Sequence, residues 1–319
     1  MNSVQPNIEK SIEILVENIK GLQEPIDQLS NQLRELLDTA NSEAQLSGIS
    51  GKSGKYWRLV TYFNSLIRIK IFIEQNFNYI EPMGLVTVTR YLFELTVWLK
   101  LMLQNEQLYG DVYYRELLKT KLKQYEQLRD HLNREVTFLQ DMDKQEGDLM
   151  TERFIEITKI TDVDEQKLAA NQLGKNVMQE IDNRASRRFT LYEEAAQFNG
   201  YGFQSHQVRT KELPRILNYI LEVELKLKEF DSTDTQDIKN RFKRWNWKEQ
   251  ASLTGMTDEY DFIYSYTSTL LHSTPVSVIT DEKNLNLGEF KIFLKYIHIR
   301  LLDIIKMVED LLLNSGFII

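Results

Sequence analysis

The sequence has no cysteine and few residues that interrupt a helix, with 13 glycines and 5 prolines in 319 residues. The absence of cysteine excludes disulfides, thiolate zinc sites and cysteine nucleophiles. Leu, Glu, Lys and Gln are abundant, and these side chains lose little rotamer freedom in a helix. We therefore expect an all-α protein built as a helical bundle.

Other absences concern charge, targeting and cofactors. The net charge of −8 gives no overall support for nucleic-acid binding, although a local basic patch can still provide it. The N-terminus is polar and acidic, which predicts no signal peptide, and the lack of cysteine suits a reducing compartment, so we expect a cytoplasmic protein. The sequence has no HExxH motif, no glutamate three residues before a histidine and no dinucleotide glycine fingerprint. We therefore expect no metal and no cofactor.

The most apolar run covers residues 85–103 and is long enough to span a bilayer. Three charged residues interrupt it, Arg90, Glu94 and Lys100. Each charge near the centre of a membrane span costs about 3 kcal/mol. The run therefore predicts a buried core helix, with no membrane as a partner.

Apolar residues follow a heptad pattern over residues 8–36, in steps of four and three. They are Ile8, Ile12, Leu15, Ile19, Leu22, Ile26, Leu29, Leu33 and Leu36. Gly21 and Pro25 lie inside the pattern, so we expect a kink or break near residues 21–24. One interpretation is a homo-oligomer, most simply a homodimer, because an unaccompanied seam exposes an apolar stripe. The alternative is two amphipathic helices packed on the rest of the chain.

The remaining patterns are helical too. Residues 56–78 and 82–104 predict two apolar helices, and residues 105–205 combine a narrow apolar stripe with many charges, which indicates a long helical hairpin. A loop at 199–206 ends this hairpin, and helices follow at 211–230 and 286–314. The expected segments are a heptad segment, a first core half, a hairpin insertion and a second core half, at residues 1–47, 48–104, 105–205 and 206–319.

Arg90 and Glu94 are one turn apart on the most apolar helix. Buried charges are usually paired, so these side chains should meet each other or a third group. They are either a structural ion pair or a site in which Arg90 presents a cation to an anionic ligand and Glu94 orients it or acts as a base.

Tyr264, Ser268 and His272 recur every fourth residue in the stretch YSYTSTLLHS, so they share one helix face. A histidine can act as a general base near neutral pH, and Ser268 lies one turn away from it. This line is either a hydrogen-bond network at a helix end or the wall of a catalytic site.

A basic segment, KNRFKRWNWK at residues 239–248, alternates cations with aromatic residues. Its basic residues are Lys239, Arg241, Lys243, Arg244 and Lys248. Cations contact phosphates and aromatic rings stack on bases, which favours a nucleic-acid site. The alternative is a surface turn that Trp245 and Trp247 anchor to the core. A smaller basic cluster, Arg184, Arg187 and Arg188, has the same two interpretations.

The order of these motifs carries a family resemblance. An R-x-x-x-E pair (RYLFE, 90–94) precedes a tryptophan-containing segment (WNWKEQASLTGM) and a Y-x-x-x-S-x-x-x-H helix (YSYTSTLLH, 264–272). This order resembles a group of uncharacterised bacterial helical proteins, a domain family of unknown function that is distantly similar to the HEPN superfamily of helical RNases and toxin components. The resemblance covers residues 56–104 and 210–312.

The resemblance implies that Arg90, Glu94, Tyr264, Ser268 and His272 converge in one polar pocket. In HEPN ribonucleases a histidine assists attack by a 2′-hydroxyl, and an arginine that precedes it with four to six residues in between holds the phosphate. No histidine here has an arginine at that spacing, so Arg90 must supply the cation from another helix.

Two functions follow as expectations. The first is a HEPN-like bacterial protein that binds or cleaves RNA, as a metal-independent ribonuclease, in phage defence or a toxin system. The second is a non-catalytic helical module that oligomerises or binds partner proteins through the heptad segment and the hairpin.

Overall fold

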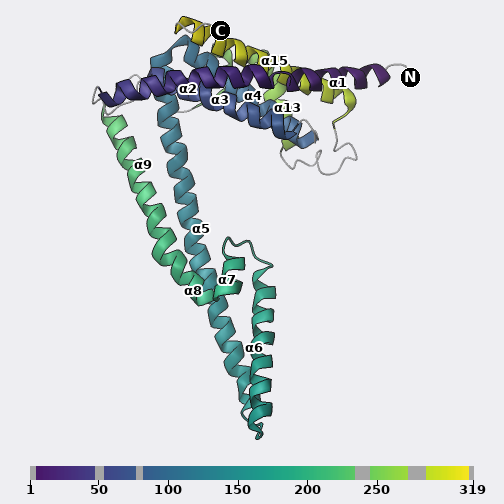
Figure 1. Ribbon diagram of the computed structural model, residues 1–319, viewed down its shortest axis with the longest axis vertical. Coiled ribbons are helices and arrows are strands. Elements are labelled where there is room, and N and C mark those ends of the chain that lie inside the picture. Colours follow the sequence, from purple (N-terminus) through teal and green to yellow (C-terminus); the bar gives the residue numbers. More distant parts are fainter. Residues whose placement is uncertain (1–4, 47–53, 77–81, 234–244, 272–284, 316–319) are drawn as a thin grey trace. The chain divides into compact units, whose positions relative to one another are not determined.

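The computed structural model describes residues 5–46, 54–76, 82–233, 245–271 and 285–315 (Figure 1). Helices account for nearly all of these residues, and none of them lies in a strand, which confirms the all-α fold. The chain divides into two compact units. Unit 1 comprises residues 1–114 and 235–319, and unit 2 comprises residues 115–234.

Unit 1 contains the helices that surround the larger core. They are α1 (Gln5–Lys20), α2 (Gln23–Leu46), α3 (Gly54–Asn76), α4 (Pro82–Gln104), α11 (Trp247–Leu253), α12 (Thr257–Glu259), the π-helix η2 (Tyr260–Tyr264), α13 (Ser265–Leu271) and α15 (Leu287–Asn314). Local signals explain two helix starts. Pro82 fits the first turn of α4, and Asn286 forms a capping box with Glu289 at the start of α15. The helices expected at 82–104 and 286–314 are confirmed to within one residue.

The heptad segment forms two helices, with a break between Lys20 and Gln23 where a kink was expected. Pro25 lies in the first turn of α2, where a missing backbone donor is tolerated. Ile19, Ile26 and Leu33 have no exposed surface. The seam packs on α3 and α15 of the same chain.

The interpretation of two amphipathic helices packed on the chain is therefore right, and the seam is not an exposed stripe. The physical reason for expecting a homo-oligomer through residues 8–36 no longer holds, because other helices of unit 1 already cover that apolar stripe.

The apolar run of α4 lies in the core, where Val97, Leu99, Leu101 and Met102 are fully buried. Neighbouring helices α3, α13 and α15 pack against it. Within the described ranges, no helix combines the length and the apolar character that a membrane crossing requires. The prediction of a buried core helix is confirmed.

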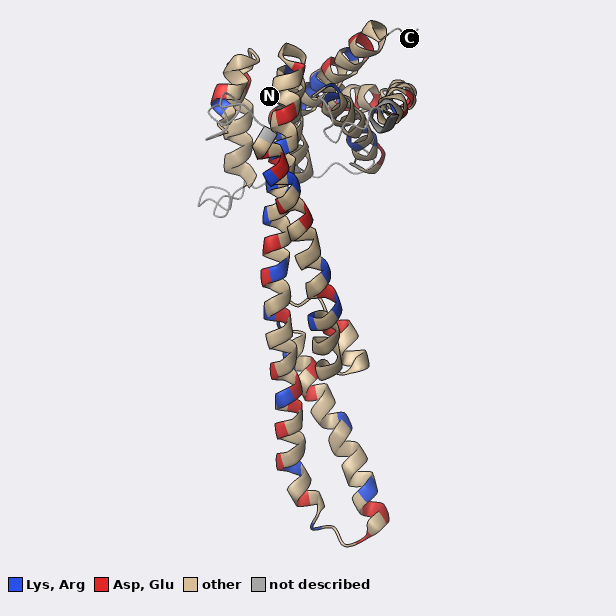
Figure 2. Cartoon of the chain, turned by 90° about the vertical axis from the view of Figure 1, so that its left-hand side faces the viewer, with Lys and Arg blue, Asp and Glu red and all other residues tan. Residues whose placement is uncertain are grey.

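Unit 2 is built on α5 (Glu106–Ile157), a 52-residue helix that starts in unit 1. The other elements of unit 2 are α6 (Val163–Ala185), α7 (Glu193–Asn199), α8 (Tyr201–Gln207), the π-helix η1 (Val208–Glu212) and α9 (Leu213–Thr233). Helix α6 runs antiparallel along the second half of α5 (Figure 1), with Leu139 and Met142 packed among Val177 and Ile181. Figure 2 shows acidic and basic residues interspersed along these long helices.

The expected hairpin exists, but the prediction of its closing loop was wrong. The closing loop at 199–206 is instead helical from Tyr201, and Gly200 alone, at φ 91°, separates α7 from α8. The compact unit that contains the hairpin covers residues 115–234, and the expected insertion covered residues 105–205. Helix α9 belongs to unit 2 because Ile216 and Ile220 pack into its core and Arg115 pairs with Asp231 at 2.8 Å.

Candidate functional site

The predicted site residues of unit 1 come from two elements that pack on each other. Helix α4 carries Arg90 and Glu94, and the helix formed by α12, η2 and α13 crosses it. The Phe93 ring of α4 lies 5.8 Å from the Tyr264 ring, which fixes the crossing point. The helix widens to a π-turn over Tyr260–Tyr264. Such π-turns are frequent at functional sites.

Arg90, Glu94 and Tyr264 form one contact group, called here the Arg90 cluster. Arg90 Nε donates to Glu94 Oε1 at 3.1 Å, and Arg90 Nη2 donates to the Tyr264 hydroxyl at 2.9 Å. The guanidinium carbon also lies 4.4 Å from the centre of the Tyr264 ring, at cation–π distance. Residues 174 positions apart are thus joined through one guanidinium group.

The Arg90 cluster is only partly buried, in contrast to the buried pair that the apolar helix predicted. The Arg90 and Glu94 side chains are 24% and 30% exposed. An ion pair at this exposure adds little stability, on the order of 0 to 1 kcal/mol, because water screens it. The exposure also leaves the guanidinium accessible to a ligand.

Tyr264 remains a hydrogen-bond donor at neutral pH. Burial raises the pKa of Tyr264 above its ordinary value, Arg90 opposes this rise, and Glu94 and Tyr260 add to it. The phenol oxygen accepts from Arg90, so its own proton is free to point elsewhere. The Arg90 cluster therefore presents guanidinium and phenol donors side by side.

Ser268 lies one turn after Tyr264 in α13 and is half-buried. His272 lies outside the described residues. The structure thus brings three of the five predicted residues into contact and places a fourth on the same helix. The catalytic roles of all five stay predictions.

The basic segment is described only from Trp245 onward, and Lys239, Arg241, Lys243 and Arg244 lie outside the described residues. Lys248 is exposed and pairs with Asp261 at 3.6 Å. The Trp245 ring stacks on Trp98 of α4, with centroids 4.1 Å apart and planes at 14°. This stacking fits the alternative in which the tryptophans anchor the segment to the core.

The aromatic residues around the Arg90 cluster were not all identified from the sequence. Tyr260 stacks on Tyr264 with centroids 4.9 Å apart, and Trp247 lies 6.3 Å from Tyr264. The spacing of Tyr260 and Tyr264, one turn apart, was the available signal. These rings and Phe93 hold Tyr264 in position.

A second polar group in unit 1 was also missed. Tyr296 of α15 donates to Glu259 at 2.9 Å, and Arg300 pairs with Asp303 at 3.1 Å. Burial raises the pKa of Tyr296, and the charge of Glu259 adds to that rise. This group ties α15 to α12 and thereby supports the helix that carries Tyr264.

Among the described residues, no group of three or more histidine and carboxylate side chains is arranged to hold a metal ion. No protein-family model, no curated protein and no solved structure matches this chain. The similarity to the HEPN-like family therefore remains an expectation from the short motifs.

Proposed function

We propose that this protein binds RNA and cleaves it at the Arg90 cluster. The supporting observation is the Arg90 guanidinium, which Glu94 and Tyr264 hold at the surface. Within the described ranges, Arg90 Nη1 makes no hydrogen bond, so its donors are open to a ligand. A planar guanidinium with adjacent free donors matches the paired oxygens of a phosphate.

The arrangement supplies two of the groups that RNA cleavage by an internal 2′-hydroxyl requires. In this reaction the 2′-hydroxyl gives its proton to a base and its oxygen forms a bond to phosphorus. The bond from phosphorus to the 5′-oxygen breaks, and that oxygen takes up a proton from an acid. Arg90 stabilises the negative charge that develops on the phosphate oxygens. Tyr264, which keeps its proton at neutral pH, donates to a phosphate oxygen or to the leaving 5′-oxygen. His272 remains the predicted acid or base.

Cleavage of a labelled single-stranded RNA by the full chain tests the proposal, with a chelator present. We expect Arg90→Ala to lower the rate about 100-fold or more, since loss of one donor to a developing oxyanion has an effect of that size. Tyr264→Phe should lower it about tenfold, which corresponds to about 1.4 kcal/mol for one hydrogen bond. Lys100→Ala removes another cation of α4 and is the control, expected within twofold of wild type. If the wild-type chain leaves RNA intact and unbound, the proposal is refuted.

A role in phage defence or a toxin system is part of the same proposal. It predicts that induced expression slows bacterial growth and that Arg90→Ala relieves the effect at equal protein level. Equal slowing by both chains would show that the effect does not come from the Arg90 cluster.

The second candidate function is a helical module that binds partner proteins. The end of the hairpin exposes apolar side chains, with Ile155 at 58%, Val163 at 62% and Leu168 at 72%. Removal of residues 1–40 is not a clean test, because α1 and α2 supply core residues. Ile155→Asp with Leu168→Asp is cleaner, and sedimentation should then show a smaller assembly. If the wild type and the double variant both sediment as monomers, the result counts against self-association through this end of the hairpin.

A further inference from the structure

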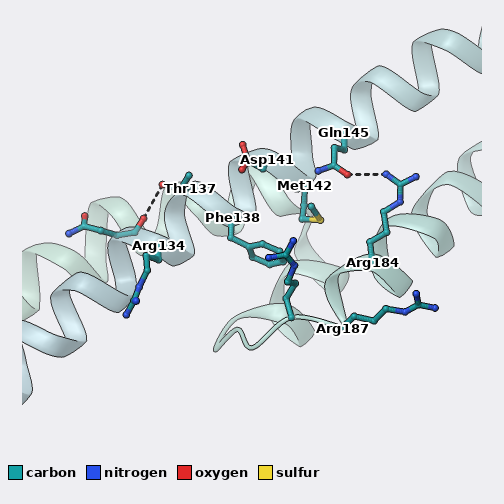
Figure 3. A pocket seen from close by; sticks show the side chains of 10 residues that line it. Arg134, Thr137, Phe138, Asp141, Met142, Gln145, Arg184 and Arg187 are labelled. Atoms are coloured by element: carbon teal, nitrogen blue, oxygen red, sulfur yellow. Dashed lines mark hydrogen bonds between the residues drawn. The ribbon is translucent and has the colours of Figure 1, made fainter.

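A groove lies in unit 2 between α5 and the segment that follows α6 (Figure 3). Its volume is about 710 Å³. Four arginines line it, Arg134 from α5 and Arg184, Arg187 and Arg188 from the end of α6 and the turn beyond it. Arg134 lies about 50 positions before the other three arginines in the sequence. The basic cluster of Arg184, Arg187 and Arg188 is therefore only part of this surface.

The groove carries positive charge that the protein does not neutralise. Within the described part of the chain, Arg134, Arg187 and Arg188 form no ion pair, whereas Arg184 pairs with Glu180. Asp141 is the one acid in the lining. A chain with net charge −8 therefore concentrates unpaired cations in one concave place, which favours an anionic ligand.

Contacts within unit 2 hold Arg184 and the turn that follows Arg188. Arg184 Nη1 donates to Gln145 Oε1 at 2.9 Å (Figure 3). Beyond the arginine turn, Thr190 Oγ1 and the Leu191 backbone N–H donate to Glu135, at 2.5 and 3.1 Å. Glu135 is 3% exposed and lies next to Arg134 on α5. A surface held in this way loses less conformational entropy when it binds a ligand.

The hollow surface continues on both sides of the groove. One neighbouring depression shares Arg134 with it and adds Asp130, and another shares Arg184 and Arg187 and adds two asparagine amides and Glu180. Both of these acids are already paired with arginines. The result is a track of guanidinium and amide donors rather than a compact pocket. Such a track fits an extended, repeating anion better than a small one.

Aromatic rings accompany the cations. Phe138 lines the groove, and the Phe189 side chain, next to Arg188, is 85% exposed. Sites for single-stranded nucleic acids combine a basic track with rings on which unpaired bases stack. Bases inside a duplex are not available for this contact.

We propose that this arginine groove binds single-stranded nucleic acid, with the arginines on successive phosphates and the phenylalanines on bases. This adds a binding surface to the proposed function and rests on it for the choice of RNA as the ligand. The groove belongs to unit 2, so its contacts are separate from those of the Arg90 cluster in unit 1.

The test is fluorescence anisotropy of the full chain with a labelled 2′-O-methyl oligouridine, which has no 2′-hydroxyl and is not cleaved. Three phosphate contacts predict that log Kd rises with log salt with a slope of about 2, from about 0.7 per contact. Arg187→Ala with Arg188→Ala should weaken binding about 15-fold at about 0.15 M salt and reduce the slope to about 0.7. The matched control is Arg209→Ala, an exposed arginine of unit 2 outside the groove, expected within twofold of wild type.

Several outcomes overturn the proposal: no binding of the strand, equal weakening by Arg209→Ala, equal affinity for a duplex, or displacement of the strand by polyglutamate at equal charge. The last outcome would identify an acidic peptide as the ligand. Equal affinity for single-stranded DNA supports phosphate recognition. A chain that binds the strand through the groove but cuts no RNA retains this proposal and refutes the proposed cleavage. If the wild-type chain cuts RNA and the double variant binds the strand normally, the proposed cleavage stands and the proposal for the groove is refuted.

Discussion

Replacement of Glu135 should destabilise unit 2 more than any other single carboxylate change on α5. This side chain is 3% exposed and accepts from the Thr190 hydroxyl and the Leu191 backbone N–H. His131 Nε2 lies 3.1 Å from the same carboxylate, although without hydrogen-bond geometry. Glu135→Ala therefore removes the hydrogen bonds that join the turn after Arg188 to α5.

The magnitude follows from the contacts. Hydrogen bonds to a charged acceptor contribute about 1.5–3 kcal/mol each, and loss of the carboxylate also removes the free-energy penalty of burying its charge. Leu191 is exposed, so water can satisfy its N–H after the change. We expect Glu135→Ala to lower the free energy of unfolding by about 3 kcal/mol. Glu135→Gln keeps one acceptor oxygen and should lower it by about 1 kcal/mol.

Thermal melting followed by circular dichroism measures both effects. At about 2–4 °C for each kcal/mol, Glu135→Ala should melt about 6–12 °C below wild type. Glu152→Ala, an exposed glutamate on the same helix, is the control and should stay within about 2 °C. A melting temperature for Glu135→Ala equal to that of the control would refute the reasoning, as would equal losses for the alanine and glutamine variants. Glu135→Ala should also bind single-stranded nucleic acid more weakly, because the arginine turn is no longer held.

Two further predictions concern unit 1 packing and pH. Gly110→Ala would place a Cβ 2.5 Å from the Gly54 Cα and should lower the free energy of unfolding by about 2 kcal/mol or more. Gly174→Ala has open space around its Cβ and should raise the free energy of unfolding by about 0.5–1 kcal/mol. Urea unfolding measures both changes, and equal effects of the two substitutions would refute the clash at Gly110. The hydrogen bond to Glu289, followed by burial, raises the pKa of Tyr266 to about 12. Because the folded pKa exceeds the ordinary value of about 10, this contribution is present below pH 10 and is lost as the pH rises towards 12. The melting-temperature difference between wild type and Tyr266→Phe should shrink over that range, and a constant difference would contradict this.

Helix positions were predictable because their signals are local. Pro82 marks the start of α4, the capping box of Asn286 marks the start of α15, and Gly21 with Pro25 marks the break in the heptad segment. Each signal acts on backbone donors within one or two turns. Gly200 shows the limit of such signals, since the polar, glycine-containing stretch predicted as a loop at 199–206 is helical from Tyr201.

The sequence by itself determined the all-α class, most helix positions and the residue types available for a site. Only the tertiary structure decided which surfaces are covered and which side chains meet, because both depend on contacts between positions far apart in the chain. The heptad pattern is the same whether a second copy or the chain's own α3 and α15 covers it. Arg90 reaches Tyr264 only because η2 and α13 pack on α4, and Arg134 lines the same groove as Arg187 and Arg188 only because α6 folds back along α5.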